Sequence, residues 1–366
     1  METDIKARLL RIFRGQDDIF KVIYTAGGAT VVAAFAAFSL LWLLLYAVDR
    51  NPAETIWSIL VGGFGSALGL KETVTRMTPL LLCALAAAIP AKGGLFNIGG
   101  EGQLHLGAIA ATSVIIYLTW LPHWMVIPAM IMMAMLGGAI WGFIPGILRG
   151  WLGVNEVLVS LMLNYVAVAL VELLVYGPWK DPLALGWPYS VSFPEWAVLP
   201  TWSGSNIHLG LPLGIAVIGL FYLLMRWTTW GFSVRVIEAN PLTATYIGLR
   251  IKIYAIVLLS LGGAMAALAG LGEVSVIQGR LREGISPGYG YTGFLITWLS
   301  RKKPIAIIPI SFLVGGFYSG ADALQLSAGL PAATVDIFMG LIFLAFLIDE
   351  YVRRRRAVAY SKQAIS

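Results

Sequence analysis

The chain has 366 residues, of which 58% are hydrophobic and only 12% charged, and its mean hydropathy is +0.82. Soluble domains carry about 25% charged residues, so this composition excludes an ordinary soluble protein and predicts an all-α integral membrane protein. The net charge of +6 is not gathered into one basic stripe, which excludes a nucleic-acid partner. The single cysteine, Cys83, excludes a disulfide within the chain.

Residues 1–27 precede the first apolar run, and their mixed charge is unlike that of a cleavable signal peptide. Within them, residues 5–21 place apolar side chains on one helical face and basic side chains on much of the rest. This pattern is typical of a helix that lies on the membrane surface, and a charged tail is the open alternative. We predict that this N-terminal segment is cytoplasmic.

A transmembrane domain is predicted over residues 28–349. A bilayer core is about 30 Å thick, so a spanning helix needs roughly 20 apolar residues. Residues 56–70 are apolar but rich in glycine, and we interpret them as a short half-helix and not as a span. Ten other apolar segments predict about ten spanning helices: 28–48, 77–91, 98–120, 124–148, 156–176, 211–227, 253–272, 290–300, 304–327 and 334–349.

The basic residues predict how these spans are oriented. With ten spans both termini fall on one side, which collects 19 of the 25 Lys and Arg residues. Lys and Arg accumulate in cytoplasmic loops, so both termini are predicted to be cytoplasmic. The basic tail 350–366 and the loop 228–252 then lie inside, and the Trp-rich and Pro-rich loop 177–210 lies outside.

Small residues recur four positions apart in two of the predicted spans. Such rows let helices in lipid approach each other closely, so they predict helix packing and say nothing of a substrate. The two rows are Gly138, Gly142 and Gly146, and Gly262, Ala266 and Gly270.

No reactive site is visible in the sequence. Neither Gly-Lys-Ser nor Gly-Lys-Thr occurs, so no nucleotide-binding loop is predicted. The three histidines lie in three different segments, without the four-residue spacing of a helical metal site. No Ser-His-Asp set is suggested either. The chain is therefore predicted to hold no cofactor and to be no enzyme.

Polar residues inside apolar segments are the remaining candidates for a site. A charged side chain near the bilayer centre costs about 2.5 to 3.5 kcal/mol and usually faces a bundle interior or a water-filled path. Residues 94–108, GLFNIGGEGQLHLGA, add a Gly-rich backbone, which membranes tolerate where protein buries it or where it lines a cavity. We predict a translocation path lined by Asn97, Glu101, Gln103, Asn155, Glu156 and Asn164.

A packing role remains the alternative for each of these residues. For Glu101 the specific alternative is a carboxylate that bonds free backbone N–H groups at a helix start.

FNIGGEGQLHLGA (96–108) resembles the signature FNIG-x-EGQ-x-x-x-GA of ABC-transporter permeases of the branched-chain amino acid and simple-sugar group, and most of all the nucleoside-type permeases. GVNEVLVSLMLNYVA (153–167), YGPWKDP (176–182) and RVIEANPLTATYIGLRI (235–251) resemble further motifs of that group. The resemblance covers about residues 75–345. Glu238-Ala239 and Leu249 are mild departures from it.

The resemblance implies the permease subunit of an importer in the bacterial inner membrane, without its own ATPase site. The implied partners are a cytoplasmic ABC ATPase, an extracytoplasmic substrate-binding protein and a second permease in a heterodimer, with a homodimer left open. The implied substrate is a nucleoside, and a simple sugar or another small polar solute is the alternative. A proton-coupled secondary transporter is the rival class, but its expected inverted repeat is missing, because the 94–108 stretch has no second copy.

The resemblance also gives the loop 228–252 a role as a coupling helix that rests on the ATPase. Asn240-Pro241 favours a helix start, with proline in the first turn, and Gly248 favours its end. An ordinary connecting loop is the alternative. The residues assigned to coupling are Arg235, Glu238, Asn240, Pro241, Ala244 and Gly248.

Overall fold

The computed structural model describes residues 51–328 apart from Ser203, together with a few single positions on either side. The chain divides into two compact units, Leu60–Gly320 and a second one made of Met1–Ile59 with Ala321–Ser366. Four predicted features lie wholly or almost wholly outside the described residues: the N-terminal segment 1–27, the spans 28–48 and 334–349, and the tail 350–366.

The described part of the chain is helical, as the composition predicts, and its only β structure is two isolated bridges, Tyr189 with Arg282 and Thr201 with His208. Two short non-α helices are η1 (Glu195–Ala197) and the π-helical η2 (Glu273–Ile277). The α-helices are α2 (Pro52–Phe64), α3 (Ala67–Ala91), α4 (Gly100–Tyr117), α5 (His123–Leu152), α6 (Glu156–Tyr176), α7 (Gly210–Trp227), α8 (Thr229–Ala239), α9 (Pro241–Tyr246), α10 (Ile251–Gly272), α11 (Tyr289–Leu299) and α12 (Pro304–Ala328).

The smaller unit contributes mainly the first residues of α2 and the last residues of α12 to the described chain. At the start of α2, the Oδ1 atom of Asn51 accepts a hydrogen bond from the backbone N–H of Ala53 at 3.1 Å. This is an N-cap, in which a side-chain oxygen satisfies one of the free N–H groups of the first turn.

Within the described residues, six helices are long and apolar enough to cross a membrane: Ala67–Ala91, His123–Leu152, Glu156–Tyr176, Gly210–Trp227, Ile251–Ile277 and Pro304–Asp322. All six overlap predicted spans. The count of ten and the cytoplasmic position of both termini stay predictions, because the first and last predicted spans lie almost wholly outside the described residues.

The first of these helices begins ten residues before the predicted span 77–91. Ser66 caps α3, and its Oγ atom accepts a hydrogen bond from the N–H of Gly69 at 2.9 Å. The charged residues of the first turns, Lys71, Glu72 and Arg76, interrupt the apolar pattern and conceal this start in the sequence. The segment 56–70, predicted as one half-helix, is consequently divided between α2 and the beginning of α3.

Two of the predicted spans are short helices: α11 is as short as its predicted segment 290–300, and α4 is shorter than its predicted segment 98–120. Helix α11 has 11 residues, and at 1.5 Å per residue it is about 16 Å long, roughly half of a bilayer core. Helix α4 has 18 residues and begins at Gly100. Both follow Gly-rich, non-helical stretches, so the polar motif and the loop before α11 replace part of a helix.

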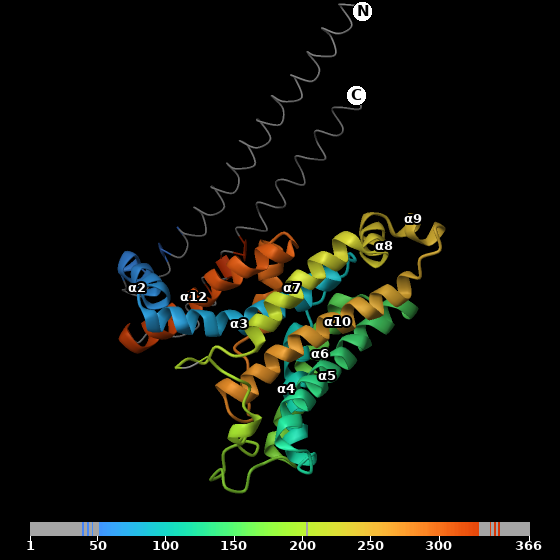
Figure 1. The fold of residues 1–366 in the computed structure, drawn as a ribbon. Coiled ribbons are helices and arrows are strands. Elements are labelled where there is room, and N and C mark those ends of the chain that lie inside the picture. The colour runs from blue at the N-terminus through green and yellow to red at the C-terminus, as the bar shows by residue number, and fades with distance from the viewer. Residues whose placement is uncertain are drawn as a thin grey trace, which may run out of the picture. The chain divides into compact units, whose positions relative to one another are not determined.

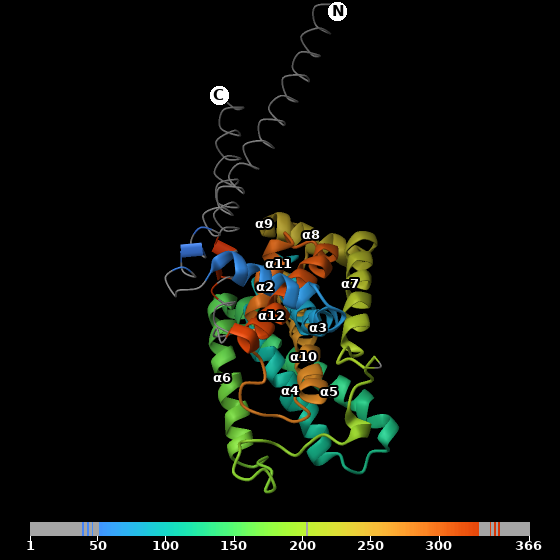
Figure 2. The same ribbon diagram turned by 90° about the vertical axis from the view of Figure 1, so that its left-hand side faces the viewer.

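Within the unit Leu60–Gly320, the two long loops predicted for opposite sides lie at opposite ends. Figures 1 and 2 show α8 and α9 at one end of the helices, and the loop between α6 and α7 at the other end. We call the first the α8 end. This arrangement agrees with the predicted alternation of the loops across the membrane.

The core of this unit contains α3, α4 and α10, and α10 runs beside α5 in both views (Figures 1 and 2). A Cβ atom added to Gly138 of α5 would overlap the carbonyl oxygen of Gly263 of α10, and the reverse also holds. On another face of α10, a Cβ on Gly270 would overlap the carbonyl oxygen of Leu104 in α4. The prediction that the small-residue rows serve helix packing is confirmed.

Candidate functional site

The segment 93–99 connects α3 to α4 without helical structure, and two side-chain amides hold it in place. The Nδ2 group of Asn97 donates hydrogen bonds to the carbonyl of Ala86 and to Oε1 of Gln103, each at 2.9 Å. The Nε2 group of Gln103 donates back to Oδ1 of Asn97 at 3.2 Å. Asn97 and Gln103 are each 1% exposed, so both amides are committed to protein partners.

Helix α6 supports the same segment through Asn164, which is completely buried. Its Oδ1 atom accepts a hydrogen bond from the N–H of Gly102 at 2.8 Å, and its Nδ2 group donates to the carbonyl of Ile98 at 3.0 Å. One side chain therefore satisfies a donor and an acceptor at the irregular start of α4. The sequence predicts this residue for a path, and the structure gives it a backbone-supporting role.

Glu156 and Asn155 lie at the start of α6. A carboxylate oxygen of Glu156 accepts a hydrogen bond from the N–H of Phe96 at 3.3 Å, and the other lies 3.3 Å from Nε of Arg149. Asn155 caps α6 by accepting a hydrogen bond from the N–H of Val157 at 2.9 Å, and its side chain is exposed. Asn155 thus stands apart from the buried amides.

Glu101 connects the start of α4 to the start of α11. Its Oε2 atom accepts a hydrogen bond from the N–H of Gly290 at 2.7 Å, where the free N–H groups of a helix start favour a negative charge. A Cβ on Gly290 would overlap the backbone of Glu101, so the two helix starts meet closely. The structural alternative for Glu101 therefore holds, at the start of α11 and not of its own helix.

The buried amides make a stability prediction possible. In Asn164→Leu the N–H of Gly102 and the carbonyl of Ile98 lose their partner, and each unpaired buried group costs about 1–3 kcal/mol. We expect the protein to lose about 3 kcal/mol of stability, measured as thermal unfolding of the purified chain in detergent. The control Asn155→Ala removes only an exposed helix cap, which costs about 1 kcal/mol. Equal losses in the two variants would contradict the role of Asn164.

A second group of polar residues lies beside the start of α11, next to the contact of Glu101 with Gly290, and the sequence reasoning missed it. Glu273 in η2 is 4% exposed and interacts electrostatically with Arg76 of α3 and Arg282 of the following loop. Arg76 donates a hydrogen bond to the hydroxyl of Tyr289 at 2.9 Å and pairs with Glu72 at 3.4 Å. The available signal was a lone acid at the end of a Gly-rich and Ala-rich apolar run.

His208 lies just before α7 and is 4% exposed. Its Nδ1 atom accepts a hydrogen bond from the N–H of Gly210 at 3.1 Å. Burial disfavours the charged imidazolium and lowers the pKa of His208 to about 4, from an ordinary value of 6.5. The side chain is therefore neutral at physiological pH.

This burial predicts a loss of stability in acid. The unfolded chain takes up a proton at His208 as the pH falls below 6.5, whereas the folded chain does so only near pH 4. Stability should be complete above pH 6.5 and fall by about 3 kcal/mol down to pH 4. In His208→Gln, the unfolding temperature measured by thermal unfolding should change less with pH across this range than it does in the wild type. An unchanged pH dependence in the variant would assign the acid sensitivity to other groups.

The segment between α7 and α10 forms two short helices, one more than the sequence predicts. Thr228 caps α8 by accepting a hydrogen bond from the N–H of Gly231. Asn240 caps α9 by accepting bonds from Leu242 and Thr243 at 2.9 and 3.2 Å, with Pro241 as the first helical residue. The chain leaves α9 through Gly248 at φ +81°. The predicted short helix and both of its boundary signals are confirmed.

Helix α8 is attached to its neighbours by polar contacts, whereas α9 projects. Arg235 of α8 donates a hydrogen bond to the carbonyl of Met225 in α7. Glu238 pairs at 3.3 Å with Lys302, which also reaches the carbonyl of Ala91 at 3.4 Å. On α9, Leu242 is 72% and Tyr246 89% exposed, although Ala244 is fully buried. The α8–α9 pair therefore presents apolar side chains outward from an anchored base.

These features define a class of protein. Several membrane-length helices, a polar motif that replaces part of a helix, and a projecting helix pair are consistent with a multi-pass membrane transport protein. Residues 69–347 match the family described as the permease component of branched-chain amino acid transport systems. The chain belongs to this family of ABC importer permeases, as the resemblance over 75–345 implies.

Curated relatives transport different solutes. The chain is 34% identical to the glucose ABC transporter permease protein TsgB13 of Haloferax volcanii, over 93% of this chain and 92% of that one. It is 27% identical to the guanosine ABC transporter permease protein NupP of Bacillus subtilis, over 88% and 92% of the two chains. It is also 27% identical to the nucleoside ABC transporter permease protein NupB of Lactococcus lactis, over 91% and 94%.

Proposed function

We propose that this chain forms part of the path by which a nucleoside crosses the bacterial inner membrane, driven by ATP hydrolysis in a partner ATPase. The main observation in support of an ATPase partner is the α8–α9 pair, in which Leu242 and Tyr246 are exposed beside an anchored α8. Such a surface suits a groove on a cytoplasmic ATPase, with α9 as the coupling helix.

The proposed orientation of the chain in the membrane follows from the distribution of its basic residues. The α8 end carries basic residues from loops and helix ends, including Lys92, Arg149, Lys252 and Lys302. Cytoplasmic loops are enriched in Lys and Arg, so we place the α8 end in the cytoplasm and the loop 177–210 outside. With ten spans in all, both termini are cytoplasmic too.

The path is proposed to run beside the motif 94–108, with Asn97, Glu101, Gln103, Asn155, Glu156 and Asn164 along its wall. The hydrogen bonds of Asn97, Gln103 and Asn164 to the protein itself suggest that they hold the irregular backbone in place. Polar substrate contacts would then come from the backbone that they position and from Asn155, whose side chain is exposed. ATP binding closes the ATPase pair, α9 transmits the movement, and the spans alternate between outward-open and inward-open states.

A nucleoside is favoured because the motifs at 96–108 and 153–167 resemble those of nucleoside-type permeases, and because two curated relatives transport guanosine or nucleosides. A simple sugar is the second candidate, since the glucose permease relative has the higher identity. The proposed partners are a second permease in a heterodimer, a cytoplasmic ATPase and an extracytoplasmic binding protein.

Uptake into vesicles tests the proposal. The chain is co-expressed with the ATPase, the second permease and the binding protein encoded beside it, and radiolabelled guanosine, adenosine, uridine, glucose and ribose are compared. We expect ATP-dependent nucleoside uptake that disappears when this chain is omitted, and that unlabelled nucleosides but not glucose suppress. Uptake of glucose or ribose alone would replace the nucleoside by a sugar. Uptake driven by a proton gradient without ATP would refute the coupling role of α9.

A further inference from the structure

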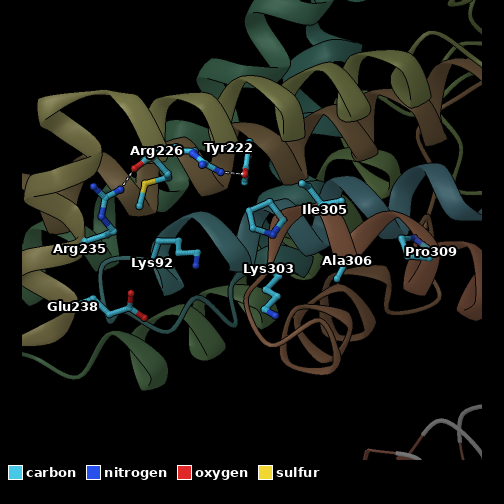
Figure 3. A pocket seen from close by; sticks show the side chains of 11 residues that line it. Lys92, Tyr222, Arg226, Arg235, Glu238, Lys303, Ile305, Ala306 and Pro309 are labelled. Atoms are coloured by element: carbon cyan, nitrogen blue, oxygen red, sulfur yellow. Dashed lines mark hydrogen bonds between the residues drawn. The ribbon is translucent and has the colours of Figure 1, made fainter.

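A hollow of about 810 Å³ lies at the α8 end of the unit Leu60–Gly320. Figure 3 shows α7 along one side of it, the first turns of α12 on another, and α8 with the end of α3 closing it. The side chains that matter for its chemistry are Lys92, Arg226, Arg235, Glu238, Lys303 and Ile305.

The hollow carries an excess of positive charge. Four of its lining side chains are cationic, and the single acid, Glu238, is already paired with Lys302 at 3.3 Å. Arg226 donates a hydrogen bond to the hydroxyl of Tyr222 at 2.8 Å, which leaves its charge uncompensated. Within the part of the chain that the structure describes, neither Lys92 nor Lys303 is paired with a carboxylate. An anion bound here would restore the balance of charge.

The rest of the lining is apolar, which narrows the choice of anion. The apolar part of the lining is formed by Met225 of α7 and by Ile305, Ala306 and Pro309 of α12. The apolar surface continues along α12 away from the cations, since Ile305 is 56% and Leu313 52% exposed. A free phosphate or an acidic peptide would leave this surface uncovered. A molecule with an anionic head and hydrocarbon chains would cover both parts.

We propose that this pocket binds the phosphate headgroup of an anionic phospholipid from the leaflet at the α8 end. Lys92, Lys303 and Arg226 surround the phosphate, and the acyl chains lie along the exposed apolar faces of α7 and α12. Basic pockets between membrane helices are suited to anionic headgroups. Because Arg235 and Glu238 belong to α8, the lipid would contact the base of the proposed coupling segment. The lipid site does not depend on which solute is transported.

Native mass spectrometry of the full-length chain, purified with and without its partner subunits, tests the site. Phosphatidylglycerol and phosphatidylcholine are titrated separately, and retained lipid is counted. The wild-type chain should retain phosphatidylglycerol preferentially. Lys92→Gln combined with Lys303→Gln should weaken this retention about tenfold or more. The matched variant Lys71→Gln with Lys180→Gln removes two cations at the other end and should retain lipid as the wild type does. Thermal unfolding verifies that both double variants are folded.

Four results would overturn the proposal. The first is unchanged phosphatidylglycerol retention in the folded Lys92→Gln/Lys303→Gln variant, and the second is equal retention of both lipids by the wild type. The third is displacement of the lipid by millimolar inorganic phosphate, which would make the site one for a free anion. The fourth is loss of lipid on addition of the ATPase, with weaker ATPase association in the variant, which would indicate an acidic protein partner.

Discussion

Glu238→Arg is expected to lower ATP-driven uptake about tenfold or more, while the protein remains folded in the membrane. The carboxylate of Glu238 lies 3.3 Å from Nζ of Lys302, and Lys302 also contacts Ala91 and the ring of Trp298. An arginine there would face Lys302 without an ion pair and would add a further positive charge at the base of the α8–α9 pair. Coupling free energies between sites are about 1–3 kcal/mol, or roughly 5- to 150-fold. Both side chains are partly exposed, so their ion pair contributes little to overall stability.

A charge reversal separates this electrostatic contact from a general disturbance of α8. Glu238→Lys combined with Lys302→Glu restores the ion pair with its signs exchanged, and uptake should recover to within a few-fold of the wild type. Uptake is measured in vesicles beside ATPase co-purification and the amount of folded chain. Normal uptake by Glu238→Arg would remove the basis for assigning this contact to coupling. An unrescued double variant would show that Glu238 acts through something other than Lys302.

Gly263→Val is expected to destabilise the helix bundle by about 3 kcal/mol, the upper part of the usual range for overpacking. The new Cβ would overlap the carbonyl oxygen of Gly138, and neither of the two main chains can move aside as a flexible side chain would. In lipid, close backbone approach at small residues is a main source of helix association. The variant should show a lower yield of monodisperse protein and a lower unfolding temperature in detergent.

Gly219→Val is the matched control on α7. Gly219 also lies within a helix, but no heavy atom lies within 4 Å of the Cβ that would be added. Its yield and unfolding temperature should stay close to those of the wild type. If the two valine variants behaved alike, the contact between α5 and α10 would not limit stability.

The sequence singled out the residues of the polar motif but could not show which hydrogen bonds they make. Asn97, Gln103 and Asn164 stand out as amides in apolar segments, and the structure brings them to one place. Sequence spacing could not reveal that they bond the backbone of the motif itself, because Asn164 is 62 residues from Gly102. The contact of Glu101 with Gly290 spans 189 residues and was equally invisible.

The prediction of helix boundaries failed where polar residues interrupt an apolar run or where glycines shorten a helix. Charged residues in the first turns of α3 hid ten residues of that helix, although Ser66 is an ordinary cap. Helix α8 was missed because its residues are not apolar enough to suggest a span. Its sequence also lacks the Asn-Pro start and glycine end that marked α9. Glu273 was overlooked because one acid at the end of an apolar run gives no sign of the arginines that approach it.

The sequence by itself determined that this is a helical membrane protein, which family it belongs to, and where α9 begins and ends. Hydropathy, motifs and helix caps can be recognised from residues that are close together in the sequence. Tertiary structure alone decided which polar atoms meet, where α10 approaches α5, and that a cationic hollow with an apolar wall lies beside α8. Those features depend on distances between segments far apart in the chain. Such distances are set by the packing of whole helices, which no single stretch of sequence encodes.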